Sequence, residues 1–177
     1  MENYFEELVK TRQACRDFND EPLEKDTIEK IVELARLAPS ACNSQPWKMY
    51  CVTEGEKKQE VLKCLTDGAR NGFLKKAQAF IVVAEKKRHL KKDVETRFSL
   101  DYFVKYDVGE LIAYLTLGAK SFGVESIVIG WVNKDKLAEV MDFEKGESCS
   151  LVVALGYSNS PLREKTRRDK DEVIKFV

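Results

Sequence analysis

The 177-residue chain has little of what a metal centre requires, because it contains one histidine, His89, and no cysteine pair in C-x-x-C spacing. Zinc sites need clustered cysteine and histidine ligands, so no metal centre is predicted. An odd number of cysteines also does not suit a disulfide framework. They are Cys15, Cys42, Cys51, Cys64 and Cys149. We expect reduced, mostly buried thiols in a reducing compartment.

The sequence also lacks an excess of either charge, since 30 lysines and arginines balance 30 aspartates and glutamates. No global positive field therefore favours nucleic acid or an acidic membrane as a partner. The first residues are acidic and lack the basic-then-apolar pattern of a signal peptide. No apolar run approaches the roughly 18 residues of a membrane span. We expect a cytoplasmic protein that binds neither nucleic acid nor membranes.

No internal repeat, low-complexity segment or interdomain linker interrupts the chain. Its hydrophobic fraction of 44% and charged fraction of 34% are ordinary for a globular protein. We expect one domain over residues 1–177, large enough to bury most of its apolar surface.

Helical spacing of apolar residues alternates along the chain with short apolar runs of strand length. The pattern predicts helices over residues 3–10, 26–38, 55–67, 108–122 and 133–141, and strands over 47–53, 79–84, 126–131 and 150–155. Single strands separated by helices indicate a three-layer α/β/α arrangement, with helices on both faces of one sheet.

Two of the predicted helices follow a capping-box pattern, an aspartate followed three positions later by glutamate. The pairs are Asp26 with Glu29 and Asp107 with Glu110, so we expect both aspartates to cap their helices. The helix after Asp107 is too apolar for the surface of a monomer. We expect it to lie centrally or at a subunit interface, and to end at Gly123.

The segment Pro39-Ser-Ala-Cys-Asn-Ser-Gln-Pro-Trp47 combines two prolines with small and amide side chains. It lies between a predicted helix and a predicted strand. A turn that only reverses the chain would not need so many hydrogen-bonding groups. The segment is therefore a candidate binding loop.

The carboxy-terminal segment, Pro161 to Lys170, carries five basic and two acidic side chains. The simpler interpretation is an ordinary solvated tail. The alternative is an anion clamp, because Lys165 and Arg167 in extended backbone would point to the same side. Together with Arg12 they could neutralise a phosphate dianion, for which arginine is well suited.

Two segments together resemble the flavin-binding motifs of the nitroreductase family: Arg12-Gln-Ala-Cys-Arg-Asp-Phe18, and Pro39 to Trp47. Asp107, the Ile129-Gly130 pair, and Gly156-Tyr157 followed by Lys165-x-Arg167 occur in the family's order. The resemblance thus extends over the whole chain. It implies a homodimeric α+β fold with a central, mostly antiparallel sheet flanked by helices, and FMN bound at the subunit interface. Members take a hydride from NADH or NADPH and reduce nitroaromatics, quinones or related acceptors.

The resemblance also implies roles for particular residues. Arg12, Lys165 and Arg167 would hold the FMN phosphate, with Gln13 and Ala14 in the same segment. Arg16 would lie beside the ribityl chain and the N1/O2 edge of the ring, where a cation stabilises the reduced flavin. No side chain is expected to act as a nucleophile, because the cofactor carries the hydride chemistry.

The remaining implied contacts surround the flavin ring. Pro39, Ser40 and Ala41 would pack on it from the partner subunit. Asn43 and Gln45 would pair with its mixed donor and acceptor edge. Ile129 and Gly130 would lie near the flavin N5, where glycine permits close approach.

The sequence departs from the family pattern in places. Ala14 stands where the family has serine, so one hydroxyl contact to phosphate is missing. Arg70 or Asn71 could supply a further polar contact. Tyr102 and Phe103 fall where relatives cover the flavin face, which makes them candidate substrate contacts.

Two alternatives remain at this point. The motifs specify cofactor binding rather than turnover, so a non-catalytic flavin store or sensor fits them as well. A thiol-based redox protein using Cys15 or Cys42 is the other.

Overall fold

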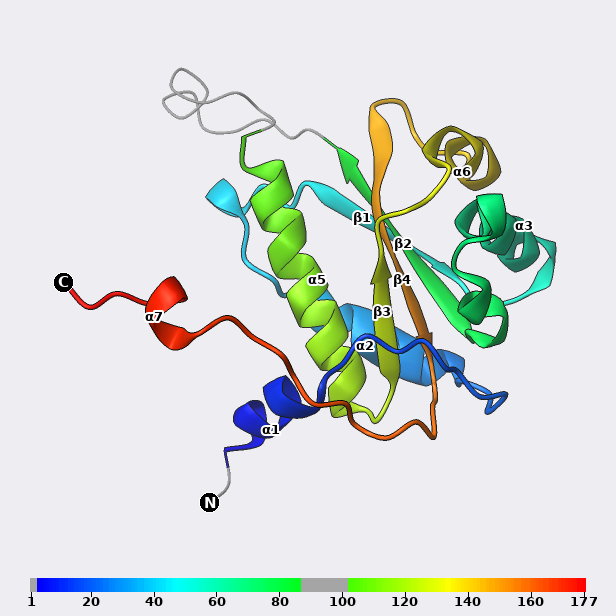
Figure 1. Cartoon of the computed structure of the whole chain (residues 1–177). Coiled ribbons are helices and arrows are strands. Elements are labelled where there is room, and N and C mark those ends of the chain that lie inside the picture. Colours follow the sequence, from blue (N-terminus) through cyan, green and yellow to red (C-terminus); the bar gives the residue numbers. More distant parts are fainter. Residues whose placement is uncertain (1–2, 87–101) are drawn as a thin grey trace.

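The computed structural model describes residues 3–86 and 102–177. Its centre is a four-stranded antiparallel sheet in the order β1-β2-β4-β3. The strands are β1 (Trp47–Val52), β2 (Ala79–Lys86), β3 (Glu125–Ile129) and β4 (Glu147–Gly156). The predicted fold class is confirmed, and β1 and β3 form the two edges of the sheet (Figure 1).

The helices are α1 (Tyr4–Thr11), α2 (Lys25–Ala35), α3 (Gly55–Leu65), α5 (Val104–Ser121), α6 (Lys134–Met141) and α7 (Lys170–Val173). Three short 3-10 turns are η1 (Ala41–Asn43), η2 (Asp67–Ala69) and η3 (Gly72–Lys76). No helix in the described ranges is long and apolar enough to cross a lipid bilayer.

Two hydrophobic clusters, one on each face of the sheet, hold the layers together. On β2, Ile81 and Val83 pack with α2 and α5, while Phe80 and Val82 pack with α3 and α6. This alternation follows from the opposite directions of successive side chains in a strand. Because both faces are covered, β2 and β4 read as continuous apolar runs rather than alternating ones.

The predicted capping boxes are wrong at both aspartates. Helix α2 begins at Lys25, after Glu24, and no side chain caps it, so Asp26 lies inside its first turn. Helix α5 begins at Val104, which places Asp107 inside the helix, 5% exposed. Its carboxylate accepts a hydrogen bond from the backbone N–H of Ala41 instead. Tertiary contact thus overrides the local pattern.

Helix α5 combines a buried face with exposed aromatic side chains. Its apolar residues pack on α2 and the sheet, and Gly118 lies against Leu34 and the Ile31 carbonyl of α2. Tyr106 and Tyr114 are 63% and 45% exposed. The helix is therefore central on one side, as predicted, and aromatic on its exposed surface. It ends before Gly123, whose φ is +72°.

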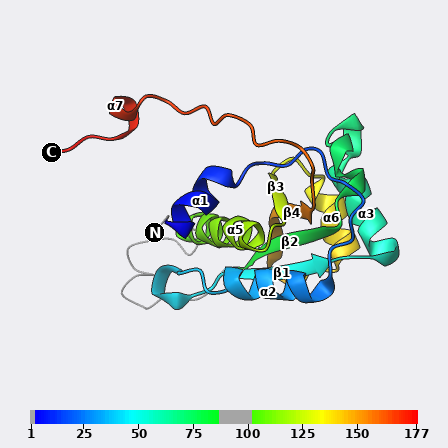
Figure 2. The ribbon, with the colours of Figure 1, turned by 90° about the horizontal axis from the view of Figure 1, so that it is seen from below.

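The two ends of the chain run along the β3 side of the molecule, opposite to α2 and β1 (Figure 2). A parallel bridge joins Ala14 to Ser126 at the start of β3, and the Cys15 N–H donates to the Ser126 carbonyl at 2.9 Å. Residues 157–169 have no regular secondary structure and lead to α7, away from the sheet (Figures 1 and 2).

Candidate functional site

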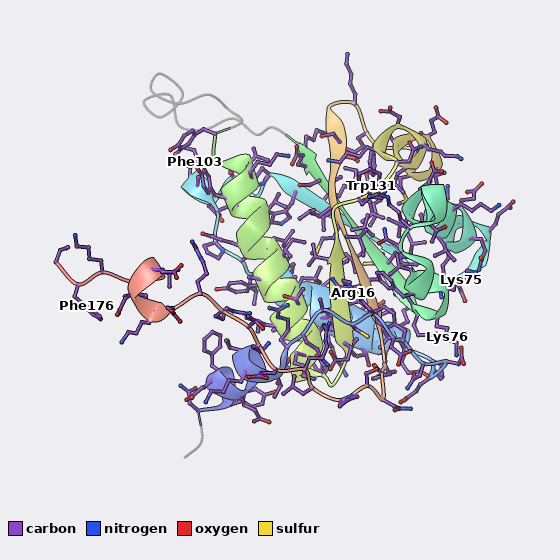
Figure 3. All side chains as sticks on the ribbon, in the orientation of Figure 1. Arg16, Lys75, Lys76, Phe103, Trp131 and Phe176 are labelled. Atoms are coloured by element: carbon purple, nitrogen blue, oxygen red, sulfur yellow. The ribbon has the colours of Figure 1, made fainter. Side chains whose placement is uncertain are left out.

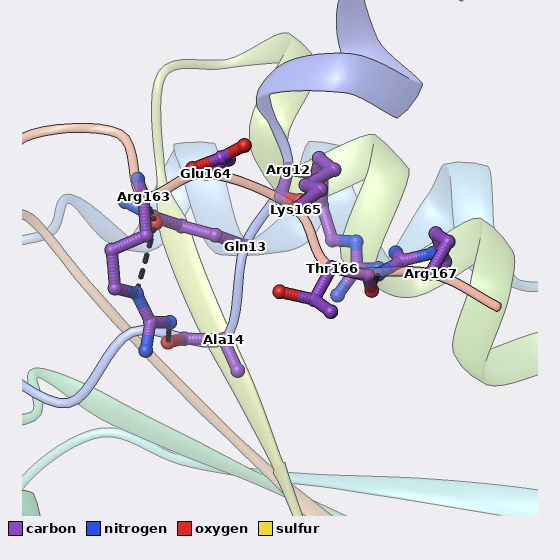
Figure 4. Close-up of a pocket in the computed structure, with 8 residues that line it drawn as sticks. All are labelled: Arg12, Gln13, Ala14, Arg163, Glu164, Lys165, Thr166 and Arg167. Carbon is purple, nitrogen blue, oxygen red and sulfur yellow. Dashed lines mark hydrogen bonds between the residues drawn. The ribbon is translucent and has the colours of Figure 1, made fainter.

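A cluster of four basic side chains, Arg12, Arg163, Lys165 and Arg167, lines a cavity of about 290 Å³ (Figure 4). We call it the cation cluster. Residues 12–14 and 163–167 supply its walls, so segments from the two ends of the chain meet here. The three cations predicted to form an anion clamp are therefore brought together in one cavity.

Contacts between the two segments fix the tail at the cavity. Gln13 Oε1 accepts from the backbone N–H and from Nε of Arg163 at 3.1 and 3.3 Å, and Gln13 Nε2 donates to the Pro161 carbonyl. Arg163 also donates to the Ala14 carbonyl, and Lys165 Nζ to the Arg12 carbonyl. Both ends of the Gln13 amide are thus engaged with the tail. The sequence interpretation counted Arg163 only as a charge and missed this positioning role.

The cavity lining carries a net positive charge, because it holds four basic side chains and one acidic one, Glu164. Burial lowers the pKa of Lys165, and the neighbouring charges of Arg12, Arg167 and Arg163 lower it further. No ion pair joins any of the four cations to a carboxylate in residues 3–86 and 102–177. An anion in this cavity would relieve the repulsion and meet several N–H donors at once.

Arg16 lies further along the same segment, beside β3 (Figure 3). Its side chain is exposed and makes no hydrogen bond or ion pair among the described residues. Ile129 ends β3 and is buried, and Gly130 follows it on the surface. A Cβ built on Gly130 would meet only Leu151, at 3.7 Å, so packing within the chain does not require glycine there.

The predicted binding loop, Pro39 to Trp47, is built from unusual backbone. Cys42, Asn43 and Gln45 have φ values of 53°, 53° and 45°, in a left-handed region that residues other than glycine rarely adopt. The Ser40 hydroxyl accepts from the Gln45 N–H at 2.9 Å, and Gln45 Nε2 donates to Asn43 Oδ1 at 3.1 Å. The loop is held in a defined shape, with its Asn43 and Gln45 side chains exposed.

The carboxylate of Asp107 in α5 holds this loop by hydrogen bonds. Its Oδ1 accepts from the Ala41 N–H at 3.0 Å, and its Oδ2 lies 3.5 Å from the Ser44 hydroxyl. The sequence interpretation placed Asp107 in the family's order but gave it a capping role. Only the fold reveals its contact, because 66 residues separate it from Ala41.

The predicted binding loop and the cation cluster lie near opposite edges of the sheet. The loop leads into β1 and touches Asp107 near the start of α5, whereas Ala14 pairs with β3 just beyond the end of α5. Three strand spacings separate β1 from β3, about 14 Å. From Asp107 to Ser121, α5 spans about 21 Å.

Tyr102 and Phe103 precede α5, at the same end of the helix as the predicted binding loop. Their rings meet edge to face with centroids 4.8 Å apart, and Tyr102 also contacts Tyr106. Most of the charged and aromatic stretch that precedes them, including His89 and Phe98, lies outside the described residues.

The cysteines do not form a redox pair within the chain. Cys15 is buried beside β3, and Cys42 is exposed in the predicted binding loop near β1. Cys64 and Cys149 are buried, and Cys51 is exposed. No group of three or more metal-ligating side chains occurs in the part of the chain that the structure describes.

Thiol reactivity tests this arrangement. Burial raises the pKa of Cys149 from 9.0 to about 11, so the thiol resists ionisation in the folded protein. We expect Ellman's reagent at pH 8 to modify the exposed Cys42 quickly and the three buried thiols only after unfolding. Cys51 should react in the native protein but more slowly than Cys42, because burial and the charge of Glu29 raise its pKa. The Cys149 contribution to stability should persist below pH 9 and be lost as pH rises through 11. Rapid reaction of all five thiols in the native protein would contradict the burial of Cys15, Cys64 and Cys149.

Taken together, the sheet with helices on both faces and the cation cluster define an α+β protein in which segments from near its two ends line one cavity. The model of the nitroreductase family matches residues 9–70 and 56–157. The chain belongs to the nitroreductase family, which confirms the family predicted from the two motifs.

Individual relatives agree with this assignment. A protein of Archaeoglobus fulgidus provisionally named NADH dehydrogenase/NAD(P)H nitroreductase is 28% identical over 169 residues, covering 93% of this chain and 90% of that protein. A nitroreductase family protein from Streptococcus pneumoniae has a TM-score of 0.86 at 25% identity, covering 98% of this chain and all of the other. A nitroreductase with bound FMN from Desulfitobacterium hafniense has a TM-score of 0.76 at 22% identity over the full length of both chains, and shares the fold.

Proposed function

We propose that the protein is an FMN-dependent oxidoreductase that uses NADH or NADPH to reduce nitroaromatic, quinone or similar acceptors. The observation that carries the proposal is the cation cluster, which joins Arg12, Lys165 and Arg167 from the two ends of the chain in one cavity. The named relatives support the reaction class, since one is called an NAD(P)H nitroreductase and another binds FMN.

The residues present fit the cofactor's phosphate. Four basic groups face one cavity and form no ion pair among the described residues, with Glu164 the one carboxylate in the lining. Burial, and then the neighbouring positive charges, lower the pKa of Lys165. A phosphate dianion would accept charge-assisted hydrogen bonds from the guanidinium groups and the ammonium. In this proposal Gln13 and Ala14 contribute indirectly, because their oxygens hold Arg163 and with it the tail.

The surface beside β3 fits the flavin ring. The exposed guanidinium of Arg16 would offset negative charge at the N1/O2 edge. The backbone of Gly130, next to Ile129, would approach N5 without a Cβ in the way. FMN would supply the hydride chemistry when bound. The protein's part is then to hold the ring, orient its partners and set the surrounding charge.

We further propose that two copies of the chain complete the site. The predicted binding loop is too far from its own cation cluster to face the same ring, whereas a second copy could present Pro39, Ser40, Ala41, Asn43 and Gln45. Exposed aromatic side chains on α1 and α5 support such an interface. They are Tyr4, Phe5, Tyr106 and Tyr114. Apolar surface of this kind is typical of subunit contacts.

The test combines mass, colour and turnover. Light scattering should give twice the chain mass of 20.3 kDa, and the purified protein should bind FMN and be yellow. Anaerobic mixing with NADH or NADPH should bleach the flavin rapidly, and 1,4-benzoquinone should restore it. A yellow protein that neither nucleotide bleaches would instead support a flavin store or sensor. A colourless protein that takes up no FMN would refute both.

A further inference from the structure

A second exposed cation, outside the cation cluster, is stacked on an aromatic ring. The guanidinium carbon of Arg70 lies 3.8 Å from the centroid of the Trp131 indole. Trp131 is 58% exposed, and Arg70 is exposed as well. Within the described ranges Arg70 forms no hydrogen bond or ion pair, so its N–H donors remain available.

Neighbouring contacts fix this pair in place. Asn71, at φ 53°, donates from Nδ2 to the Leu65 carbonyl at 2.9 Å and to the Trp131 carbonyl at 3.4 Å. Asn133 Nδ2 donates to the Asp67 carboxylate at 3.0 Å. Residues 67–71 are thus joined to residues 131–133 at several points.

The pair lies beside the proposed ring site. Trp131 directly follows Gly130, and Arg16 lies lower along β3 (Figure 3). The proposed ring position is therefore next to an exposed indole that carries a guanidinium. The indole offers an apolar surface for an aromatic ring, and the guanidinium offers charged N–H donors for an anionic substituent.

We propose that Arg70, stacked on Trp131, recognises the carboxylate of an anionic aromatic acceptor. This inference rests on the proposed function and names the acceptor class for it. A guanidinium matches a carboxylate with two parallel N–H donors. Stacking holds the guanidinium plane before the acceptor arrives, which lowers the entropic cost of binding.

The test compares two acceptors of one shape, 4-nitrobenzoate and the neutral 4-nitrobenzyl alcohol, on the FMN-loaded protein. Arg70→Gln should raise KM for 4-nitrobenzoate about tenfold, because an exposed charge-assisted pair is lost. With FMN kept saturating, so that any contact of Arg70 to the cofactor does not limit the rate, the variant should leave kcat, and both constants for the alcohol, within about twofold. Arg70→Lys keeps the charge but lacks the two parallel N–H donors, so its KM for 4-nitrobenzoate should lie between those of the parent and Arg70→Gln. Arg168→Gln, the same charge change in the tail, serves as the matched control.

A binding measurement separates this proposal from the proposed function. Calorimetric titration of 4-nitrobenzoate into the oxidised, FMN-loaded protein requires no turnover, and Arg70→Gln should weaken the Kd about tenfold relative to the Arg168→Gln control. Equal Kd values for the two variants would overturn the proposal even if the enzyme is active. A rise in KM confined to NADPH, with NADH and 4-nitrobenzoate unchanged, would also overturn it, because Arg70 would then bind the nucleotide phosphate. Failure of the parent protein to turn over the neutral acceptor would instead count against the proposed function.

Discussion

Replacing both Lys165 and Arg167 by alanine is expected to weaken FMN binding on the order of 100-fold. A hydrogen bond to a charged group contributes about 1.5–3 kcal/mol, and solvent exposure reduces each of these contacts to roughly a factor of ten. The two cations share one cavity with Arg12 and Arg163, so the combined loss need not equal the sum of the single losses. The measurement is the Kd of FMN by flavin fluorescence quenching in the apoprotein.

The tail offers a control with the same change of charge. Arg168→Ala with Lys170→Ala also removes two positive charges, and neither residue lines the cavity. This control should keep FMN affinity within about threefold. The parent's affinity should fall with rising salt concentration, and the cavity variant's should fall less steeply, because fewer charges then face the phosphate. If both double variants weakened FMN equally, a general electrostatic attraction would replace the proposed phosphate site.

The fold follows closely from local pattern because each buried strand is apolar on both sides. The run Ala79 to Ala84 could only lie between two covered faces, and the structure places helices on both. The ends of the helices and strands differ from the predicted ones by a few residues. The capping boxes were wrong for a different reason. Local spacing cannot show that the Asp107 carboxylate accepts a hydrogen bond from a residue 66 positions away.

The candidate site was only partly predictable from sequence. Motif order suggested that Arg12 and Lys165–Arg167 act together, and the structure brings them into one cavity. Motif order did not reveal the role of Arg163, because its contacts to Gln13 and Ala14 depend on how the tail crosses residues 12–14. The pairing of Arg70 with Trp131 joins residues 61 positions apart in the sequence. Such contacts arise from tertiary packing, and no spacing rule along one segment encodes them.

The separation of the predicted binding loop from the cation cluster gives Asp107 a particular importance. The loop holds three non-glycine residues at positive φ, a conformation that costs free energy and persists only where surrounding contacts hold it. Asp107 is the buried contact beneath it. We therefore expect the shape of the loop, and with it the surface offered to a second subunit, to depend on this carboxylate.

Asp107→Ala is accordingly expected to lower the free energy of unfolding by about 2–3 kcal/mol, since it removes a charged acceptor and leaves the Ala41 N–H unpaired. Asp107→Asn keeps one oxygen acceptor and should cost less than about 1 kcal/mol. Glu110→Ala, an exposed carboxylate in the same helix, is the matched control and should change stability by at most about 0.5 kcal/mol. Urea unfolding measures all three.

The same variants distinguish a local role from a merely structural one. If Asp107 shapes the loop for a partner's flavin, Asp107→Ala should weaken both dimerisation and FMN binding at temperatures where the chain remains folded. FMN binding to the cation cluster of a single chain would survive in part, because Arg12, Lys165 and Arg167 lie near β3, at the opposite edge of the sheet from the loop. Unchanged dimer and FMN affinities in a folded Asp107→Ala protein would show that the loop does not contribute to the site.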